Sequence, residues 1–174
     1  MARTLAAVRF PAVAADPSPD LVLTPLEGKA RTVRQLVTTF HLLFVALDPF
    51  EEPSTWILES AVRILKTFEQ ADVRVALVIT AGPADARLWL GPHAQELLVF
   101  TDPDRSVVKG FGLEYLPAIV HVSMDGTLMG SAEHWHPNEW FKVTENLARI
   151  TAWKGPIVPG PKDPGPFEGT PAQG

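Results

Sequence analysis

The sequence of 174 residues contains no cysteine. A disulfide, a thiolate nucleophile and a zinc or iron–sulfur site with cysteine ligands are therefore excluded. The same absence excludes activity as a thiol oxidoreductase or a thiol peroxidase, because both need a reactive cysteine. Enzymes of other kinds stay open at this point, although the missing chemistry favours a protein that is not an enzyme.

Long apolar runs are also missing. A membrane-spanning helix needs about 20 consecutive apolar residues, whereas the most apolar runs here are Leu42–Leu47 and Val75–Ile79. Arg9 and Pro11 interrupt the apolar start of the chain, so we expect no signal peptide. We therefore predict a cytoplasmic protein that does not insert into membranes.

Basic clusters and nucleotide-binding motifs are absent too. The 20 acidic and 15 basic residues give a net charge of −5, which argues against nucleic acid as a partner. Gly110 and Gly112 do not extend to a GxGxxG pattern, and neither a GxxxxGK[ST] loop nor a GxSxG motif occurs. We predict no cofactor.

The apolar content, 46% of the residues, is enough for one domain with a core. The periodic apolar pattern runs through residues 21–153, which we assign to a single domain. Residues 1–20 carry Pro11, Pro17 and Pro19 and little periodicity. We expect them to form an irregular N-terminal arm.

Residues 154–174 form a tail of different composition. From Gly155 onward it holds six prolines and five glycines in twenty residues, so neither a helix nor a central strand is expected there. Tails of this composition are usually disordered. The apolar residues Ile157, Val158 and Phe167 nevertheless favour a tail that packs on its own domain or on a second copy.

Within residues 21–153, apolar runs alternate with helical patterns. Ile57, Ala61 and Leu65 recur at helical spacing, and Asp125-Gly126 is the dipeptide expected at a tight hairpin turn. The predicted elements are strands at 41–47, 73–80, 97–101, 118–123 and 127–130, helices at 54–69, 84–90, 105–111 and 137–152, and a short helix that begins near residue 33.

This order predicts the fold class. Helices between successive strands imply parallel pairing, whereas the hairpin near the end is antiparallel. We therefore predict an α/β sandwich with a mixed central sheet and helices on both faces.

Two segments resemble proteins of known fold. Thr101–Leu128 resembles the second half of thioredoxin-like proteins, where an aspartate-led helix ends in glycine and is followed by a proline, an edge strand and an Asp-Gly turn. Phe40–Phe68 resembles the strand and helix that carry the active site of peroxiredoxins and thiol reductases. The resemblance extends over about Leu21–Ala152 and implies a thioredoxin-like α/β/α sandwich. It also places Pro117 at the position of the family's cis-proline.

The same resemblance implies a degenerate active site. The two cysteines of a thiol reductase would fall at about Pro49 and Glu52, and the peroxidatic cysteine of a peroxiredoxin at Pro53. The neighbouring Pro and Thr of peroxiredoxins fall on Ala46 and Phe50, and their catalytic arginine has no counterpart. The chain thus resembles a non-redox relative.

Proteins of this superfamily hold extended client backbone beside the cis-proline, and such a groove does not require cysteine. The resemblance therefore implies a protein-binding or assembly module, whose partner is an unknown protein or a second copy. The groove is predicted to comprise Phe50, Pro53, Trp56, Leu116 and Pro117, with Asp48, Glu51 and Glu52 at its rim.

Two other interpretations stay open. The acidic residues Asp48, Glu51 and Glu52 have a simpler explanation as stabilisers of the first turn of the following helix, or they serve a non-thiol enzyme. His134 and His136 project to the same side of an extended segment and form a candidate metal-binding pair, which needs a third ligand. Surface and capping roles would explain these histidines equally well.

Overall fold

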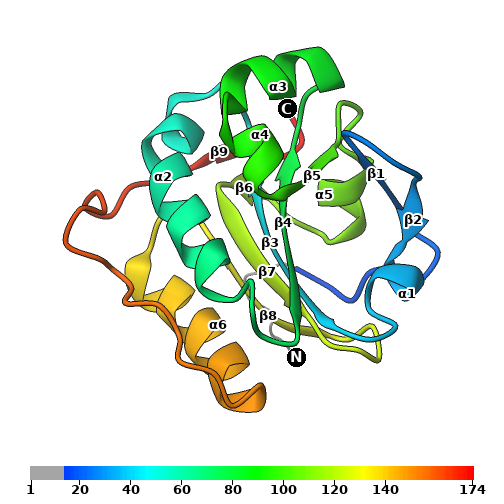
Figure 1. The fold of residues 1–174 in the computed structure, drawn as a ribbon. Helices are drawn as coiled ribbons and strands as arrows, with labels where there is room; N and C mark the ends of the chain where they lie inside the picture. The colour runs from blue at the N-terminus through cyan, green and yellow to red at the C-terminus, as the bar shows by residue number, and fades with distance from the viewer. Residues whose placement is uncertain (1–13) are drawn as a thin grey trace, which may run out of the picture.

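A computed structural model describes residues 14–174, and its centre is a mixed sheet (Figure 1). Residues 1–13 of the predicted N-terminal arm lie outside the described residues. The strands are β1 (Val22–Pro25), β2 (Arg31–Thr32), β3 (His41–Leu47), β4 (Val73–Ile79), β5 (Leu98–Thr101), β6 (Tyr115–Leu116), β7 (Ala118–Val122), β8 (Leu128–Glu133) and β9 (Thr170–Pro171). The helices are α1 (Val33–Leu36), α2 (Glu52–Thr67), α3 (Pro83–Leu90), α4 (His93–Glu96), α5 (Ser106–Gly110) and α6 (Pro137–Ile150).

The seven-stranded sheet has the order β2-β1-β5-β4-β3-β7-β8, and β6 and β9 form a separate pair. β3, β4 and β5 are parallel, whereas β7 pairs antiparallel with both β3 and β8. The predicted mixed sheet is therefore confirmed.

β3 is buried along its whole length because both faces of the sheet are covered. Leu43 and Val45 point into one core, whereas Leu42 and Phe44 point into the other. A continuous apolar run is the pattern expected of such a strand. Helices α2, α3 and α6 contribute to the first core and α1 and α5 to the second, so the predicted α/β sandwich is confirmed.

Local sequence explains helix α2. Glu52 lies in its first turn, where a negative charge stabilises the positive end of the helix, and Pro53 is compatible with the first turn because no helical N–H is lost there. Ile57, Ala61 and Leu65 form its buried face. The helix starts two residues before the predicted position and ends at Thr67.

Helix α5 begins differently from the prediction. Arg105 has a left-handed backbone with φ of 61°, so the helix begins only at Ser106. Asp102 still caps it from a distance, because its carboxylate accepts hydrogen bonds from the N–H groups of Val107 and Val108 at 3.0–3.1 Å. Burial raises the pKa of this carboxyl, and the two backbone bonds oppose that shift.

Strands β1, β2, β6 and β9 and helix α4 were not among the predicted elements. Each has two to four residues, which is too few to show a period of their own.

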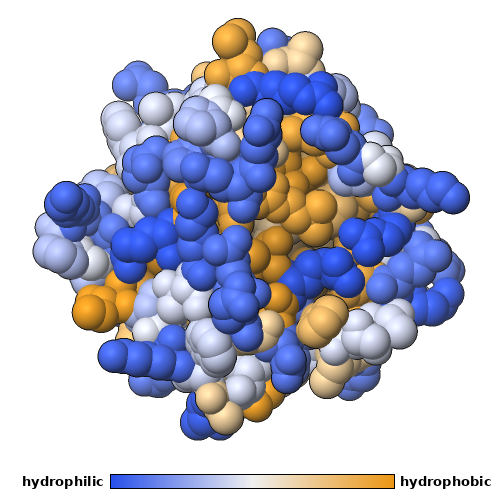
Figure 2. Space-filling model, in the orientation of Figure 1, coloured by the Kyte–Doolittle hydropathy of each residue, from blue (hydrophilic) through white to orange (hydrophobic). Residues whose placement is uncertain are grey.

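On the face in Figure 2, hydrophilic residues surround a region of hydrophobic ones in the middle of the view, where Figure 1 has β4, β5 and α5. In residues 14–174 no helix is both long and apolar enough to cross a membrane.

The tail after α6 lies on the domain instead of extending away from it. It runs back beside α6 and its last residues lie next to β6 (Figure 1). Gly155 approaches α6 so closely that an added Cβ would lie 3.1 Å from that of Ala148. Val158 joins the core formed with α2 and α6.

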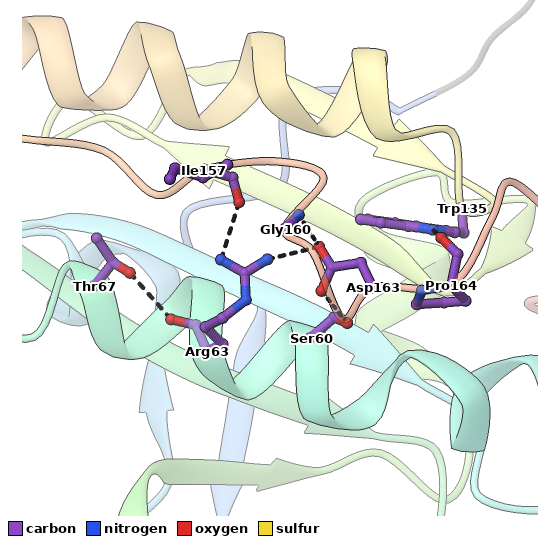
Figure 3. A network of polar contacts seen from close by, with 8 residues as sticks. All are labelled: Ser60, Arg63, Thr67, Trp135, Ile157, Gly160, Asp163 and Pro164. Carbon is purple, nitrogen blue, oxygen red and sulfur yellow. Dashed lines mark hydrogen bonds and ion pairs between the residues drawn. The ribbon is translucent and has the colours of Figure 1, made fainter.

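A buried carboxylate fixes the middle of the tail (Figure 3). Asp163 accepts hydrogen bonds from Ser60, from the Arg63 guanidinium and from the N–H of Gly160, each at 2.6 Å. Arg63 also donates to the carbonyl of Ile157 at 2.9 Å. Only 3% of the Asp163 side chain is exposed, so these bonds replace the water that the carboxylate lost on burial. We call this set of contacts the Asp163 anchor.

We predict that Asp163→Ala loosens the tail from α2. The substitution leaves Ser60 and Arg63 without their acceptor, and the free energy of unfolding should fall by about 1–3 kcal/mol. Chemical denaturation gives the stability, and amide hydrogen exchange over residues 155–166 gives the local effect. Lys162→Ala, at the exposed neighbouring position, is the control. Equal exchange in both variants would show that the anchor does not hold the tail.

Candidate binding surface

Asp48, which directly follows β3, is buried with 4% of its side chain exposed. Its Oδ2 atom accepts a hydrogen bond from Arg105 at 2.8 Å, and its Oδ1 atom accepts one from the N–H of Phe50 at 3.0 Å. The N–H of Asp48 donates to Ser54 in α2 at 2.8 Å. Asp48 was predicted at the rim of a groove, but it is an internal ion-pair partner that fixes the loop between β3 and α2.

The other two acidic residues of the predicted rim are exposed. Glu51 precedes α2 without a side-chain capping bond, and Glu52 lies in the first turn of the helix. The carboxylate of Asp48 is turned inward to Arg105, so the three acids do not form one acidic site. This arrangement offers no support for a non-thiol enzyme that would use these three acids together.

Leu116 and Pro117 are buried, and the peptide bond between them is cis. The tail covers this position. β9 pairs antiparallel with β6, with Thr170 opposite Leu116 and Pro171 opposite Tyr115. One residue further, the N–H of Ala172 donates to the carbonyl of Glu114 at 2.8 Å.

The tail also pairs with the chain just after β8. The N–H of Trp135 donates to the carbonyl of Phe167 at 2.9 Å, and the N–H of Phe167 donates back at 3.1 Å. The ring of Phe167 meets the ring of Trp56 edge to face, with centroids 5.3 Å apart. Trp56, which is 53% exposed, and Leu116 thus lie along the path of tail residues 167–172.

We call the surface under residues 167–172 the β6 surface. It contains two residues of the predicted groove, Trp56 and Leu116, and three residues that the groove prediction did not include. These three are Tyr115, Trp135 and Arg105.

Arg105 holds the end of the tail to the β6 surface. One of its guanidinium nitrogens donates to the carbonyl of Ala172 at 2.5 Å, while the other pairs with Asp48. Nothing in the local sequence marks this role, because Asp48 and Ala172 are 57 and 67 residues away.

The role of Glu133, at the end of β8, was also not predicted. Its carboxylate accepts hydrogen bonds from the N–H groups of Glu114 and Tyr115 at 2.9 and 2.7 Å. Burial raises the pKa of this carboxyl, and the two backbone bonds act in the opposite direction. Glu133 therefore fixes the position of β6 next to the tail.

The rings of His134 and His136 stack with centroids 5.1 Å apart, so they do lie on one side of the chain. They contact the tail. The Nδ1 atom of His134 accepts a hydrogen bond from the N–H of Gly169 at 2.8 Å, and the Nε2 atom of His136 lies 3.0 Å from Glu168. The Nδ1 lone pair of His134 therefore accepts this hydrogen bond and is not free to bind a metal ion. Among residues 14–174, no group of three or more His, Asp or Glu side chains is arranged to hold a metal ion, so the metal interpretation gains no support.

A second pair of histidines is buried at the far end of β3. The Nδ1 atom of His41 lies 2.9 Å from the Nε2 atom of His121. The remaining ring nitrogen of His121 has no hydrogen-bond partner among the described residues. Burial, together with the neighbouring His41, lowers the pKa of His121 to about 4. The unpartnered nitrogen is therefore best accommodated in an uncharged ring.

Comparisons with known proteins support the fold. No protein-family model matches the sequence, and no curated protein matches it. A putative thioredoxin from Neisseria meningitidis is 14% identical, with a TM-score of 0.64 over 78% of this chain and 91% of that one. The bacterioferritin comigratory protein of Xanthomonas campestris, which reduces alkyl peroxides, is 16% identical, with a TM-score of 0.61 over 83% of this chain and 98% of that one.

One match extends into the tail. A hypothetical protein of Sinorhizobium meliloti 1021 is 14% identical, with a TM-score of 0.64 over 95% of this chain and 96% of that one. Because residues 154–174 make up 21 of the 174 residues, a match over 95% includes part of them. The chain has a thioredoxin-like fold, as the resemblance implied, and it lacks the cysteines of the thiol-disulfide oxidoreductases that share this fold.

We predict that the buried His121 makes the protein less stable in mild acid. Its pKa lies below that of an unfolded histidine, so the unfolded chain binds more protons between pH 6.5 and 4. Stability contributed by the neutral ring is complete above pH 6.5 and is lost as the pH falls towards 4, by as much as about 3 kcal/mol.

Denaturant unfolding at several pH values tests this prediction. His121→Gln should flatten the loss of stability below pH 6.5. His93→Gln is the matched comparison with the opposite sign, because the hydrogen bonds that His93 donates to Glu59 and Glu96 raise its pKa. Replacement of His93 should make the loss of stability in acid steeper, since a histidine whose pKa is raised on folding stabilises the folded state at low pH. A His121→Gln variant that loses stability between pH 6.5 and 4.5 as steeply as the unaltered chain would contradict the role given to His121.

Proposed function

We propose that this chain is a non-redox binding module that takes up an extended protein segment along the β6 surface. The observation that carries the proposal is the tail itself, because residues 167–172 lie there as a peptide ligand would. Backbone hydrogen bonds hold the tail at Glu114 and Trp135, and Arg105 adds a third attachment at Ala172. Addition of a strand to an exposed edge is a general mode of peptide recognition.

The absence of cysteine fits this role. A thiol chemistry would need a reactive group at the start of α2, where the chain has Pro49, Glu52 and Pro53 instead. Peptide binding by backbone hydrogen bonds and side-chain contacts needs no such group. A cytoplasmic location, expected from the sequence, is part of this proposal.

The tail has to leave before a partner can bind. A covalently linked segment competes at a high effective concentration, typically in the millimolar range for a short linker. β9 contributes only two residue pairs to its ladder with β6, and Pro171, Gln173 and Gly174 are exposed. The ladder between β6 and β9 is thus short, and exchange with a segment of another protein or of a second copy also requires the hydrogen bonds to Trp135, His134 and Arg105 to open.

The test uses the full chain and a synthetic peptide of residues 164–174. Gly169→Ala displaces the tail, because an added Cβ would lie 2.2 Å from the carbonyl oxygen of Leu116. We expect the peptide to bind this variant at least about tenfold more tightly than the unaltered chain, whose own tail competes. Isothermal calorimetry or fluorescence anisotropy measures both affinities.

Gly165→Ala is the matched control, because an added Cβ there would meet nothing within 4 Å. This variant should keep its tail in place and bind the peptide as weakly as the unaltered chain does. Hydrogen exchange at residues 167–172 shows directly whether the tail has been displaced. A displaced tail without saturable peptide binding would overturn the proposed function.

A further inference from the structure

We infer that the β6 surface selects extended segments of the pattern aromatic–acidic–glycine–β-branched apolar–any–alanine. We also infer that its own tail binds more weakly than a segment that matches the pattern in full. The inference rests on the proposed function and specifies the partner. In the tail the six positions are Phe167 to Ala172. Each constraint follows from a separate contact.

The glycine position is set by sterics. The backbone of Gly169 passes so close to β6 that a Cβ would lie 2.2 Å from the oxygen and 2.8 Å from the carbon of the Leu116 carbonyl. These atoms are backbone and cannot rotate away as a side chain would. The N–H of Gly169 donates a hydrogen bond to His134, which fixes the position of the segment relative to β6. Any segment that follows the same path therefore needs glycine here.

The acidic position faces two histidines. The carboxylate of Glu168 has one oxygen 3.0 Å from the Nε2 atom of His136 and the other 3.5 Å from the Nδ1 atom of His134. Its side chain is 76% exposed, so this contact contributes to selectivity more than to affinity. A lysine at this position would offer no acceptor to the Nε2 atom of His136, whereas glutamine would still offer its amide oxygen.

Both ends of the pattern are set by packing. At the start, the aromatic ring of Phe167 meets Trp56 edge to face. At the other end, the side chain of Ala172 is completely buried, and Arg105 holds its carbonyl. A larger residue would not fit without moving the second core. Pro171, between them, is exposed and is not constrained.

Thr170 is the position at which the tail is a poor ligand. Its hydroxyl is buried and has no hydrogen-bond partner within residues 14–174. A buried hydroxyl without a partner weakens binding, and valine has the same shape without this penalty. A partner with valine or isoleucine at this position therefore has an advantage over the resident tail, which explains how an external segment can compete with a covalently linked one.

The experiment measures competition on the full-length Gly169→Ala chain. A fluorescein-labelled peptide of residues 164–174 is bound first, and unlabelled peptide variants then displace it. Ala172→Arg, which also removes the tail from its site while it leaves Gly169 unchanged, serves as a second host chain. Its use ensures that the results do not depend on the folding of one variant.

Three results are expected. The peptide with Thr170→Val should compete about tenfold better than the native peptide. The peptide with Gly169→Ala should lose competition, whereas the peptide with Gly165→Ala should compete as the native one does. The peptide with Glu168→Lys should compete less well than the one with Glu168→Gln.

The failures are distinguishable. If the native peptide binds neither host, the proposed function is wrong. If the peptide binds but the two glycine variants compete equally, or the Thr170→Val peptide competes no better, then the surface binds segments without this pattern and the inference is overturned.

Discussion

The contact between Arg105 and Asp48 connects parts of the chain that are distant in sequence. A carboxylate buried at the end of β3 needs a compensating charge, because an unpaired charge in the interior is strongly unfavourable. Arg105 supplies it from the turn before α5 and has a second nitrogen left for the carbonyl of Ala172. The loop that follows β3 thus holds an ion pair next to Pro49, where the resemblance places a cysteine of thiol reductases, and that ion pair secures the last residues of the tail.

Most of the fold could be predicted from the sequence, because its main elements have clear periodic patterns. β3 spans the predicted residues 41–47, and β4, α2 and α6 differ from the predictions by only a few residues at their ends. The hairpin around Asp125-Gly126 also forms as expected. These elements bury continuous apolar faces, so their positions are encoded locally.

The binding surface could be predicted only in part. Trp56 and Leu116 were expected there because of the family resemblance, and both line the path of the tail. Arg105, Glu133 and Gly169 were not, because their roles depend on partners far away in sequence. The course of the tail was equally hidden, since no local pattern connects Ser60 with an acceptor 103 residues later. Composition excluded a helix or a central strand, and Ile157, Val158 and Phe167 favoured a tail that packs on its own domain or on a second copy, but neither indicated its path.

The Asp163 anchor lies between the part of the tail that packs on α2 and α6 and residues 167–172, which the proposed function treats as exchangeable. If a partner segment took the place of residues 167–172, the tail would stay tethered at Asp163. Its return would be a first-order process whose rate does not depend on protein concentration, whereas rebinding of a released partner would depend on it. Dilution of the partner would then be enough to restore the closed form, without the action of an enzyme.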